Sequence, residues 1–321
     1  MRAYIGRRLL QAVVVVFVVV TFMFFLFRLI PADPTTLLVE SGATEEARQR
    51  LLERWGLTGS TLEQYWRYML NVFSGDFGSS FFYQKPVMSV LLPAVVNTLW
   101  IAIPGMLLGS AIGVALGVVV GWARRGGIGE RAGIFLATIV RGTPDFVLGI
   151  LVLMLFSSLL GWFPAFGIGE LGGGSGITRY FTWSFFLHLA LPVIALMIYF
   201  IPENLLLMRA GVVENRDEDY VDLVRAKGVK ESVVARHAAR NSLLPVVTWL
   251  FPALAETVGG IIILEVVFSW PGVGRELVLA VNRQDYPVAQ GAFFLLAIAI
   301  VLANLIADLV YAKLDPRVTY V

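Results

Sequence analysis

Six mainly apolar stretches of about 20 residues or more alternate with polar segments along this chain of 321 residues. A helix satisfies its own backbone hydrogen bonds, and about 20 residues of helix cross the hydrocarbon layer of a bilayer. The pattern therefore predicts an all-α integral membrane protein. We place its six transmembrane helices at Leu9–Ile30, Thr98–Gly121, Ile134–Leu160, Trp183–Met208, Leu243–Phe268 and Val288–Tyr311.

The first apolar stretch follows Arg2, Arg7 and Arg8, as the core of a signal peptide would. Its apolar run is longer than the roughly 7–15 residues of such a core, and no small-residue cleavage site follows it. We therefore predict that it is retained as a transmembrane helix.

The basic residues fix the orientation of the spans. Outside the predicted helices, 15 Lys and Arg residues lie in one alternating set of segments and 8 in the other. Cytoplasmic segments carry the excess of positive charge, so both termini are expected in the cytoplasm. We divide the chain into the cytoplasmic end with the first helix (1–30), an extracytoplasmic segment (31–97), a transmembrane core with a cytoplasmic loop at 209–245 (98–312), and a cytoplasmic tail (313–321).

The composition excludes several function classes. Only 15% of residues are charged and the mean hydropathy is +0.78, whereas charged residues approach a quarter of a soluble domain. The net charge of +2 is spread along the chain, which does not favour a nucleic-acid partner. There is no cysteine and there are two histidines, His188 and His237, so we expect no disulfide and no metal centre.

No enzyme motif occurs either. HExxH and GxSxG are absent, and so is the GxxxxGK[ST] loop that cradles the phosphates of ATP. We expect a chain that is not an enzyme, binds no cofactor and cannot use ATP by itself.

A row of glycines marks the second predicted span. Gly105, Gly109, Gly113, Gly117 and Gly121 recur every four residues, so they line one slowly rotating helix face that another helix can approach closely. The partner helix can belong to this subunit or to another one, and the sequence favours neither.

Four ionisable residues stand out within the predicted spans, where charge costs about 2.5–3.5 kcal/mol at the membrane centre. Arg141 and Asp145 are four residues apart and are predicted to pair on one helix face, with a structural pair favoured over a functional one. Glu203 lies near an inner helix end, from which it can reach cytoplasmic water. Glu256 is the best candidate to line a substrate path, where its carboxylate meets an ammonium group; a helix-packing hydrogen bond made by a protonated Glu256 is the alternative.

The cytoplasmic segment from Arg209 to Pro245 mixes both charge signs with apolar residues at helical spacing. We predict a first short helix with Tyr220, Leu223 and Val224 on one face and a second with Val229 and Val233 on one face, joined by a sharp turn at Gly228. Such a projection suits docking to another protein, and a solvated loop is the alternative.

The outer segment between the first two spans is long enough to fold. The stretch around Glu45–Trp55, ending near Gly56, and the stretch EQYWRYMLNVF are predicted amphipathic helices. They form either a gate or docking surface for an extracytoplasmic protein, or a cap over the helix ends. SWPGVG at Ser269–Gly274 predicts a re-entrant or capping turn.

The stretch Asp222–Pro245, DLVRAKGVKESVVARHAARNSLLP, resembles the cytoplasmic "EAA" loop of binding-protein-dependent ABC permeases, in the longer form of dipeptide and oligopeptide importers. Leu223 and Val224 stand in place of the two alanines of the general motif. The resemblance implies that this loop couples the permease to an ATPase. The residues it assigns to the loop are Asp222, where many members have Glu, the turn residues Ala226, Lys227 and Gly228, the neighbouring Val229 and Val233, and Arg236, Arg240, Asn241 and Pro245, which lead into the fifth span.

Further segments are similar to the same permeases in the same order, and the outer segment resembles that of the "B" member of a B/C permease pair. These segments are RRLLQ at Arg7–Gln11, RLIPADP at Arg28–Pro34, GWFPAFG at Gly161–Gly167, EVVFSWPGVGRELVLAV at Glu265–Val281, DYPVAQG at Asp285–Gly291 and DPR at Asp315–Arg317.

The resemblance implies a type I ABC importer permease in a bacterial or archaeal cytoplasmic membrane, forming half of a path for peptides. It also implies a homologous C-type permease, two ATPases that use ATP and Mg²⁺, and an extracytoplasmic binding protein as partners, besides membrane lipid. Relatives that import nickel, glutathione or oligosaccharides leave the substrate open. An ATP-independent transporter or channel is the alternative from another class; it would need inverted repeats or a path of midplane charges, and neither is clear here.

Overall fold

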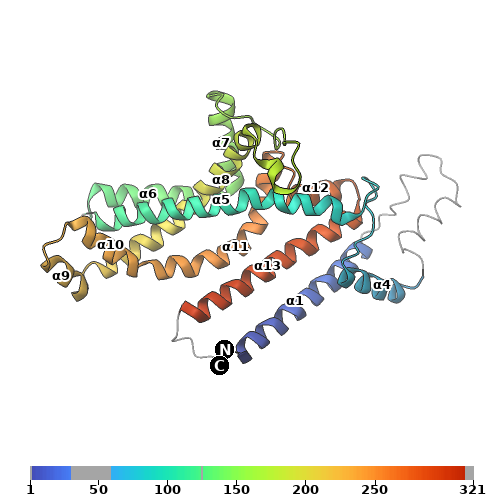
Figure 1. Ribbon diagram of the computed structural model, residues 1–321, viewed down its shortest axis with the longest axis horizontal. Coiled ribbons are helices and arrows are strands. Elements are labelled where there is room, and N and C mark those ends of the chain that lie inside the picture. The colour runs from blue at the N-terminus through green and yellow to red at the C-terminus, as the bar shows by residue number, and fades with distance from the viewer. Residues whose placement is uncertain (1, 30–58, 124–125, 315–321) are drawn as a thin grey trace. The chain divides into compact units, whose positions relative to one another are not determined.

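The computed structural model describes residues 2–29, 59–123 and 126–314 (Figure 1). Contacts divide the chain into two compact units, Met1–Thr98 with Pro271–Leu305 and Leu99–Trp270 with Ile306–Val321. The predicted helix around Glu45–Trp55 lies outside the described residues, as do Arg124, Arg125 and the DPR segment at Asp315–Arg317.

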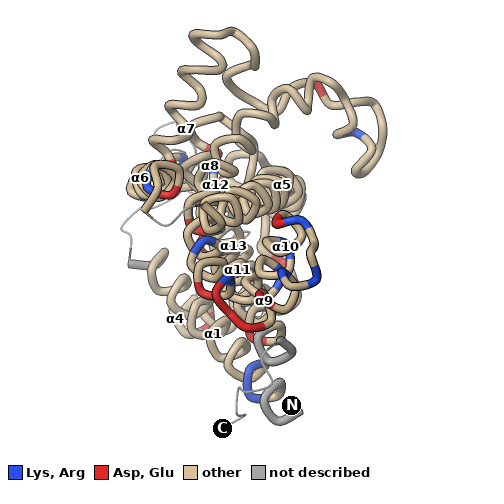
Figure 2. Tube along the Cα trace, turned by 90° about the vertical axis from the view of Figure 1, so that its left-hand side faces the viewer, with Lys and Arg blue, Asp and Glu red and all other residues tan. Residues whose placement is uncertain are grey.

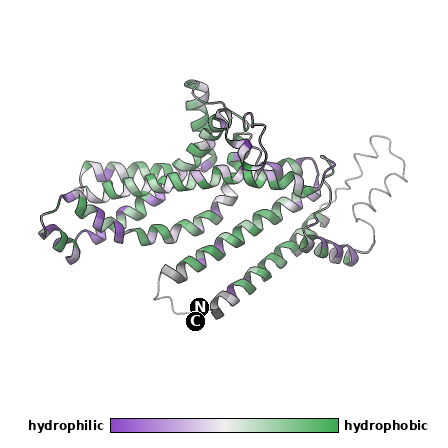
Figure 3. Ribbon diagram, viewed as in Figure 1, coloured by the Kyte–Doolittle hydropathy of each residue, from purple (hydrophilic) through white to green (hydrophobic). Residues whose placement is uncertain are grey.

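Helices make up most of the described chain, and the long ones are apolar along most of their length (Figure 3). A π-helical turn at Met154–Leu159 continues α7, and a 3₁₀ turn at Gly176–Tyr180 precedes α8. The α-helices are α1 (Arg2–Leu29), α4 (Thr61–Ser74), α5 (Val87–Trp122), α6 (Ile128–Arg141), α7 (Asp145–Leu153), α8 (Trp183–Asn215), α9 (Asp219–Ala226), α10 (Glu231–Asn241), α11 (Leu243–Val267), α12 (Val273–Asn282) and α13 (Tyr286–Leu314).

The expected multi-pass α-helical fold agrees with these helices. Within the described residues, α1, α5, α8 and α13 are each long and apolar enough to cross a membrane. Two bent pairs raise the number of spans to six if each pair counts as one: α6 with α7 and its π-helical turn, bent by 100°, and the two parts of α11, bent by 56°. Two predicted boundaries were wrong, because α5 already begins at Val87 and α8 runs on to Asn215.

The third predicted span, Ile134–Leu160, is not one continuous helix. One helix, α6, ends at Arg141, and the next, α7, begins at Asp145. Pro144 has no N–H to donate into a continuing helix, and it disfavours helical backbone at the residue before it. The prediction that Arg141 and Asp145 share one helix face was therefore wrong.

The first unit packs α4 against α1 around Val20, Met69 and Val72. Asp285, which is buried, holds the turn before α5: it accepts hydrogen bonds from the Ser80 hydroxyl and from the backbone N–H groups of Phe81 and Phe82. The predicted turn at Ser269–Gly274 leads into α12, whose N-cap is Gly272.

In the second unit, α8 packs against α6, α7, α10 and α11. The glycine row of α5 also lies against α8. A Cβ atom placed on Gly109 or Gly113 would come within 2.6 Å of a carbonyl oxygen of α8, and one on Gly105 or Gly117 within 2.8 Å or 2.6 Å of an α8 side chain. The glycine face thus packs against a helix of this subunit. Of the two alternatives, a helix of this subunit or of another one, the first is correct.

Candidate functional site

The segment after α8 folds into two short helices, α9 and α10, joined by a turn at Gly228; we call residues 219–241 the elbow. Gly228 has a φ of +72°, in the left-handed region, and its N–H donates to the carbonyl oxygen of Arg225 at 3.0 Å. A Cβ at this position would meet nothing within 4 Å. It is therefore the backbone conformation, and not a lack of space, that favours glycine at the predicted turn.

The inner face of the elbow is apolar. Val221 of α9 and Val234 and Ala238 of α10 are fully buried against one another, and Tyr220 and Val224 pack beside them, as does Trp122 of α5. These contacts seat the elbow on the end of α5.

Of the residues assigned to apolar helix faces, Leu223 is exposed and Val229 lies outside a helix. Leu223 is 67% exposed, on the other side of α9 from Val221. Val229 is exposed in the turn, because the backbone is extended at Lys230 and α10 begins only at Glu231. The prediction that Val229 and Val233 share a helix was wrong.

The outer face of the elbow is exposed and mixed in character. Figure 2 shows acidic and basic residues together on α9 and α10. Leu223 and Val229 add apolar area to this charged surface. Of the residues assigned to ATPase coupling, Val233 is half-buried and the others are exposed: Asp222, Ala226, Lys227, Gly228, Val229, Arg236, Arg240, Asn241 and Pro245.

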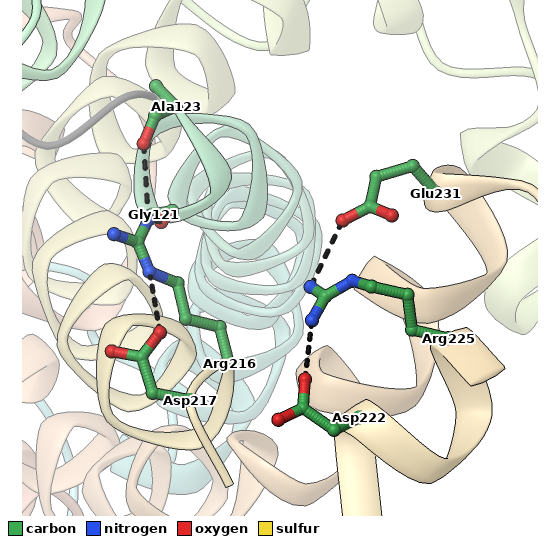
Figure 4. Close-up of polar contacts among 7 residues, drawn as sticks. All are labelled: Gly121, Ala123, Arg216, Asp217, Asp222, Arg225 and Glu231. Atoms are coloured by element: carbon green, nitrogen blue, oxygen red, sulfur yellow. Dashed lines mark hydrogen bonds and ion pairs between the residues drawn. The ribbon is translucent and has the colours of Figure 1, made fainter.

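Arg225 joins the two arms of the elbow (Figure 4). Its guanidinium donates to Asp222 on α9 at 2.6 Å and to Glu231 on α10 at 3.2 Å. The hydrogen bond to Glu231 and the negative charges of both carboxylates raise the pKa of Arg225. The bridge spans the Gly228 turn and so opposes a change in the angle between the arms.

A second arginine ties the end of α8 to α5. Arg216 donates to the carbonyl oxygens of Gly121 and Ala123 at 3.0 and 3.2 Å (Figure 4). Such carbonyls at a helix C-terminus lack partners within the helix and attract positive charge. Between the two arginines lies a polar cleft of about 380 Å³, lined by Trp122, Arg216, Asp217, Asp222, Arg225 and Glu231.

A partly buried polar network fixes the base of the elbow. Asn215 at the end of α8 donates to the Ser242 hydroxyl at 3.2 Å and accepts from the Tyr220 hydroxyl at 3.0 Å. Ser242 itself is buried and donates to the carbonyl oxygen of Ala238. No sequence pattern marked the contacts of Asn215, Arg216, Arg225 or Ser242, because polar residues in a charged segment give no periodic signal of contact.

A separate group of charges lies in the predicted spans. Arg141 pairs with Glu203, with its Nε 2.9 Å from the carboxylate, instead of with Asp145. The Asp145 carboxylate points toward Gly260 of α11, where a Cβ would lie 2.7 Å from its oxygen. The structure thus brings Arg141 and Glu203 together and turns Asp145 toward the helix that carries Glu256.

Tyr199 lies near these carboxylates. It lies one helical turn before Glu203 on α8 and interacts electrostatically with Asp145, Glu203 and Glu256. Glu256 is exposed, and within the described part of the chain its carboxylate forms no ion pair. Tyr199 was not among the predicted site residues, although its spacing of four from Glu203 was a usable signal.

The long apolar helices, the exposed elbow and the intramembrane carboxylates define a multi-pass membrane transport component. The chain belongs to the family of binding-protein-dependent transport system inner membrane components, which matches residues 113–320. A second family, the N-terminal part of binding-protein-dependent transport system membrane components, matches residues 1–102.

Individual relatives are similar over the whole chain. The glutathione transport system permease protein GsiC of Salmonella paratyphi A is 33% identical over 319 residues, which is 99% of each chain. The GsiC protein of Escherichia coli K12 is 32% identical over 319 residues, again 99% of each chain. The probable peptide ABC transporter permease protein y4tP of Sinorhizobium fredii is 33% identical over 321 residues, 100% of each chain.

The expected resemblance to peptide-type ABC permeases is confirmed. The protein is a multi-pass inner-membrane permease subunit of an ABC importer, with the type I importer fold. A subunit of this kind works with a partner permease, an ATPase and a substrate-binding protein.

Proposed function

We propose that this chain forms one half of a translocation path for small peptides and that its elbow receives the movement of the partner ATPases. The observation that carries the proposal is the elbow itself: an exposed, mixed surface on a base held by Arg216, Asn215 and Ser242. In the chain, the elbow lies between the spans α8 and α11. Because it is rigid at its base, it transmits a movement of the ATPases to these two spans.

The partners in this proposal are two ATPases, a homologous C-type permease and an extracytoplasmic binding protein. ATP and Mg²⁺ act in the ATPases. When the ATPases close, they tilt the elbow and switch the proposed translocation path between outward-facing and inward-facing states.

The proposed substrate class is a peptide with a free ammonium end, either a di- or oligopeptide or a tripeptide such as glutathione. The names of the relatives support it, since they describe glutathione and peptide permeases. The charge near Tyr199 is consistent with it, because among the described residues Asp145, Glu203 and Glu256 act on Tyr199 and Arg141 pairs with Glu203 alone. An excess of negative charge favours passage of a cationic group.

Transport by the complete importer in proteoliposomes tests the proposal. We expect ATP-dependent uptake of labelled di-, tri- or oligopeptides in the presence of the binding protein, and ATPase subunits that co-purify with this chain. Uptake without ATP would instead favour a secondary transporter or channel. Uptake of nickel or an oligosaccharide alone would overturn the peptide assignment and leave the importer assignment intact.

The path itself is tested with Glu256→Gln. Removing this exposed carboxylate should reduce the uptake of cationic peptides more than that of neutral peptides, while binding-protein-stimulated ATP hydrolysis continues. Unchanged uptake of both peptide classes would remove Glu256 from the path.

A further inference from the structure

Helix α4 has three distinct sides. At 100° per residue, Tyr65, Tyr68, Met69 and Val72 share the side that packs on α1. The neighbouring side carries four large apolar residues that are each at least half exposed: Leu62, Trp66, Leu70 and Phe73. The remaining side is polar, with Glu63, Gln64, Arg67, Asn71 and Ser74.

Both ends of α4 are firmly capped. Ser60 and Glu63 form a reciprocal capping box at its start, and Gly75 ends it in a left-handed conformation with a φ of +79°. The caps stabilise α4 as a helix, so its four exposed apolar side chains stay together on one side.

The contacts of α4 with α1 lie below the outer end of that span. The Tyr65 hydroxyl is 3.0 Å from the hydroxyl of Thr21, and the Tyr65 ring packs edge-on against Phe24 and stacks with Phe25. The apolar span of α1 ends at Phe27. At 1.5 Å per residue, these contacts and the packing of Met69 and Val72 on Val20 lie about 3–11 Å inside the outer end of the span.

At the same depth, α1 presents apolar side chains outward. Phe22 and Phe25 are 59% and 47% exposed, as expected for a peripheral span that faces lipid. Phe25 stacks with Tyr65, whose ring contacts Trp66, so the exposed side of α4 continues the lipid-facing surface of α1.

We propose that α4 lies in the outer surface layer of the membrane, with Leu62, Trp66, Leu70 and Phe73 in contact with lipid acyl chains and Arg67 on the water side. An amphipathic helix in this position buries its apolar side about 5–10 Å into the boundary between headgroups and acyl chains, which matches the depth of its contacts with α1. Tryptophan and tyrosine are enriched at this boundary because their rings are apolar and their tips are polar.

Lipid fits this side better than the two protein partners do. A binding protein in the aqueous space would meet the polar side of α4. The apolar side of α4 instead lies at the same membrane depth as the outer part of α1. A second permease would have to cover Phe25 of α1 as well, since Phe25 stacks with Tyr65, whose ring contacts Trp66.

Single-cysteine labelling tests the position directly, because the chain contains no cysteine. Leu70→Cys, Phe73→Cys and Arg67→Cys are each labelled with a nitroxide in the complete importer, with cysteine-free partner subunits, in lipid vesicles. Collisions with oxygen, which partitions into hydrocarbon, are compared with collisions with a water-soluble nickel complex. We expect oxygen to dominate at positions 70 and 73 and the nickel complex to dominate at position 67.

Three results would overturn the proposal. If position 70 is as accessible to the nickel complex as position 67, α4 lies in water. If position 70 is shielded from both reagents, protein covers it. If adding the binding protein alone lowers oxygen access at position 70, that protein is the occupant.

A second measurement avoids the cysteine variants. Phospholipids with brominated acyl chains should quench the part of the tryptophan emission that is lost in Trp66→Phe, and a difference signal without quenching would also overturn the proposal. Neither measurement depends on the transported substrate.

Discussion

Arg225 bridges Asp222, three residues before it on α9, and Glu231, beyond the turn on α10. All three side chains are roughly half exposed or more, and each ion pair at such a surface contributes only about 0.2–1 kcal/mol. We therefore expect Arg225→Gln to leave the overall stability of the importer nearly unchanged but to loosen the angle of the elbow. Peptide uptake per ATP hydrolysed in proteoliposomes should fall.

The control for Arg225 is Arg131→Gln, which removes an exposed cytoplasmic arginine on α6, outside the elbow. Its transport per ATP should match that of the unchanged protein. Equal coupling ratios in Arg225→Gln and Arg131→Gln would mean that the bridge has no part in transmission.

Gly228 tests the turn itself. Alanine fits the free space but must adopt a left-handed backbone, at a cost of about 1–2 kcal/mol, so Gly228→Ala should weaken coupling without preventing assembly. Gly228→Trp also places a bulky ring on the exposed surface and should uncouple ATP hydrolysis from uptake while the protein still inserts. Normal uptake by the tryptophan variant would refute a coupling role for the turn.

The sequence predicted the membrane class and the turn at Gly228 because each has a strong local cause: long apolar runs for the class, and a glycine between two short amphipathic stretches for the turn. The break in the third span was missed, although Pro144 marked it, because hydropathy stays high on both sides of the break. A high hydropathy indicates that a segment lies in the membrane, but it does not indicate that the segment is one unbroken helix.

The ionic contacts were less predictable, since they depend on how separate helices approach. Spacing alone paired Arg141 with Asp145, whereas α8 supplies Glu203 as the partner from far away in the sequence. The same limit applies to Arg216, whose partners are backbone carbonyls of α5 that no sequence pattern marks.

The glycine row allows a matched comparison of one substitution at two sites. In Gly113→Ala the new Cβ would lie 2.6 Å from the carbonyl oxygen of Ile201, a backbone atom that cannot move without shifting α8. Overpacking of this kind costs about 1–3 kcal/mol, so the midpoint of thermal unfolding of the purified importer should fall. Gly129→Ala meets nothing within 4 Å and should leave the midpoint unchanged or raise it. Equal midpoints would show that α5 and α8 pack less closely than described.

Tyr83 offers a pH-dependent test of the turn before α5. Its hydroxyl donates to Glu276 at 3.0 Å and accepts from Arg283 at 3.2 Å. Burial of the phenol, followed by the charge and hydrogen bond of Glu276, raises the pKa of Tyr83, and Arg283 only partly opposes this. A raised pKa favours the neutral phenol in the folded protein, so its contribution to stability is complete below the unfolded pKa of about 10 and is lost as pH rises through the folded pKa.

An ultraviolet difference titration between the unchanged protein and Tyr83→Phe isolates this phenol. The phenolate signal of Tyr83 should appear above pH ~10, the ordinary pKa of tyrosine. Glu276→Gln removes the negative charge beside the phenol, so the signal should then appear at lower pH than in the unchanged protein. Titration of Tyr83 at or below the ordinary value would contradict its contact with Glu276, because a carboxylate at 3.0 Å must disfavour a second negative charge.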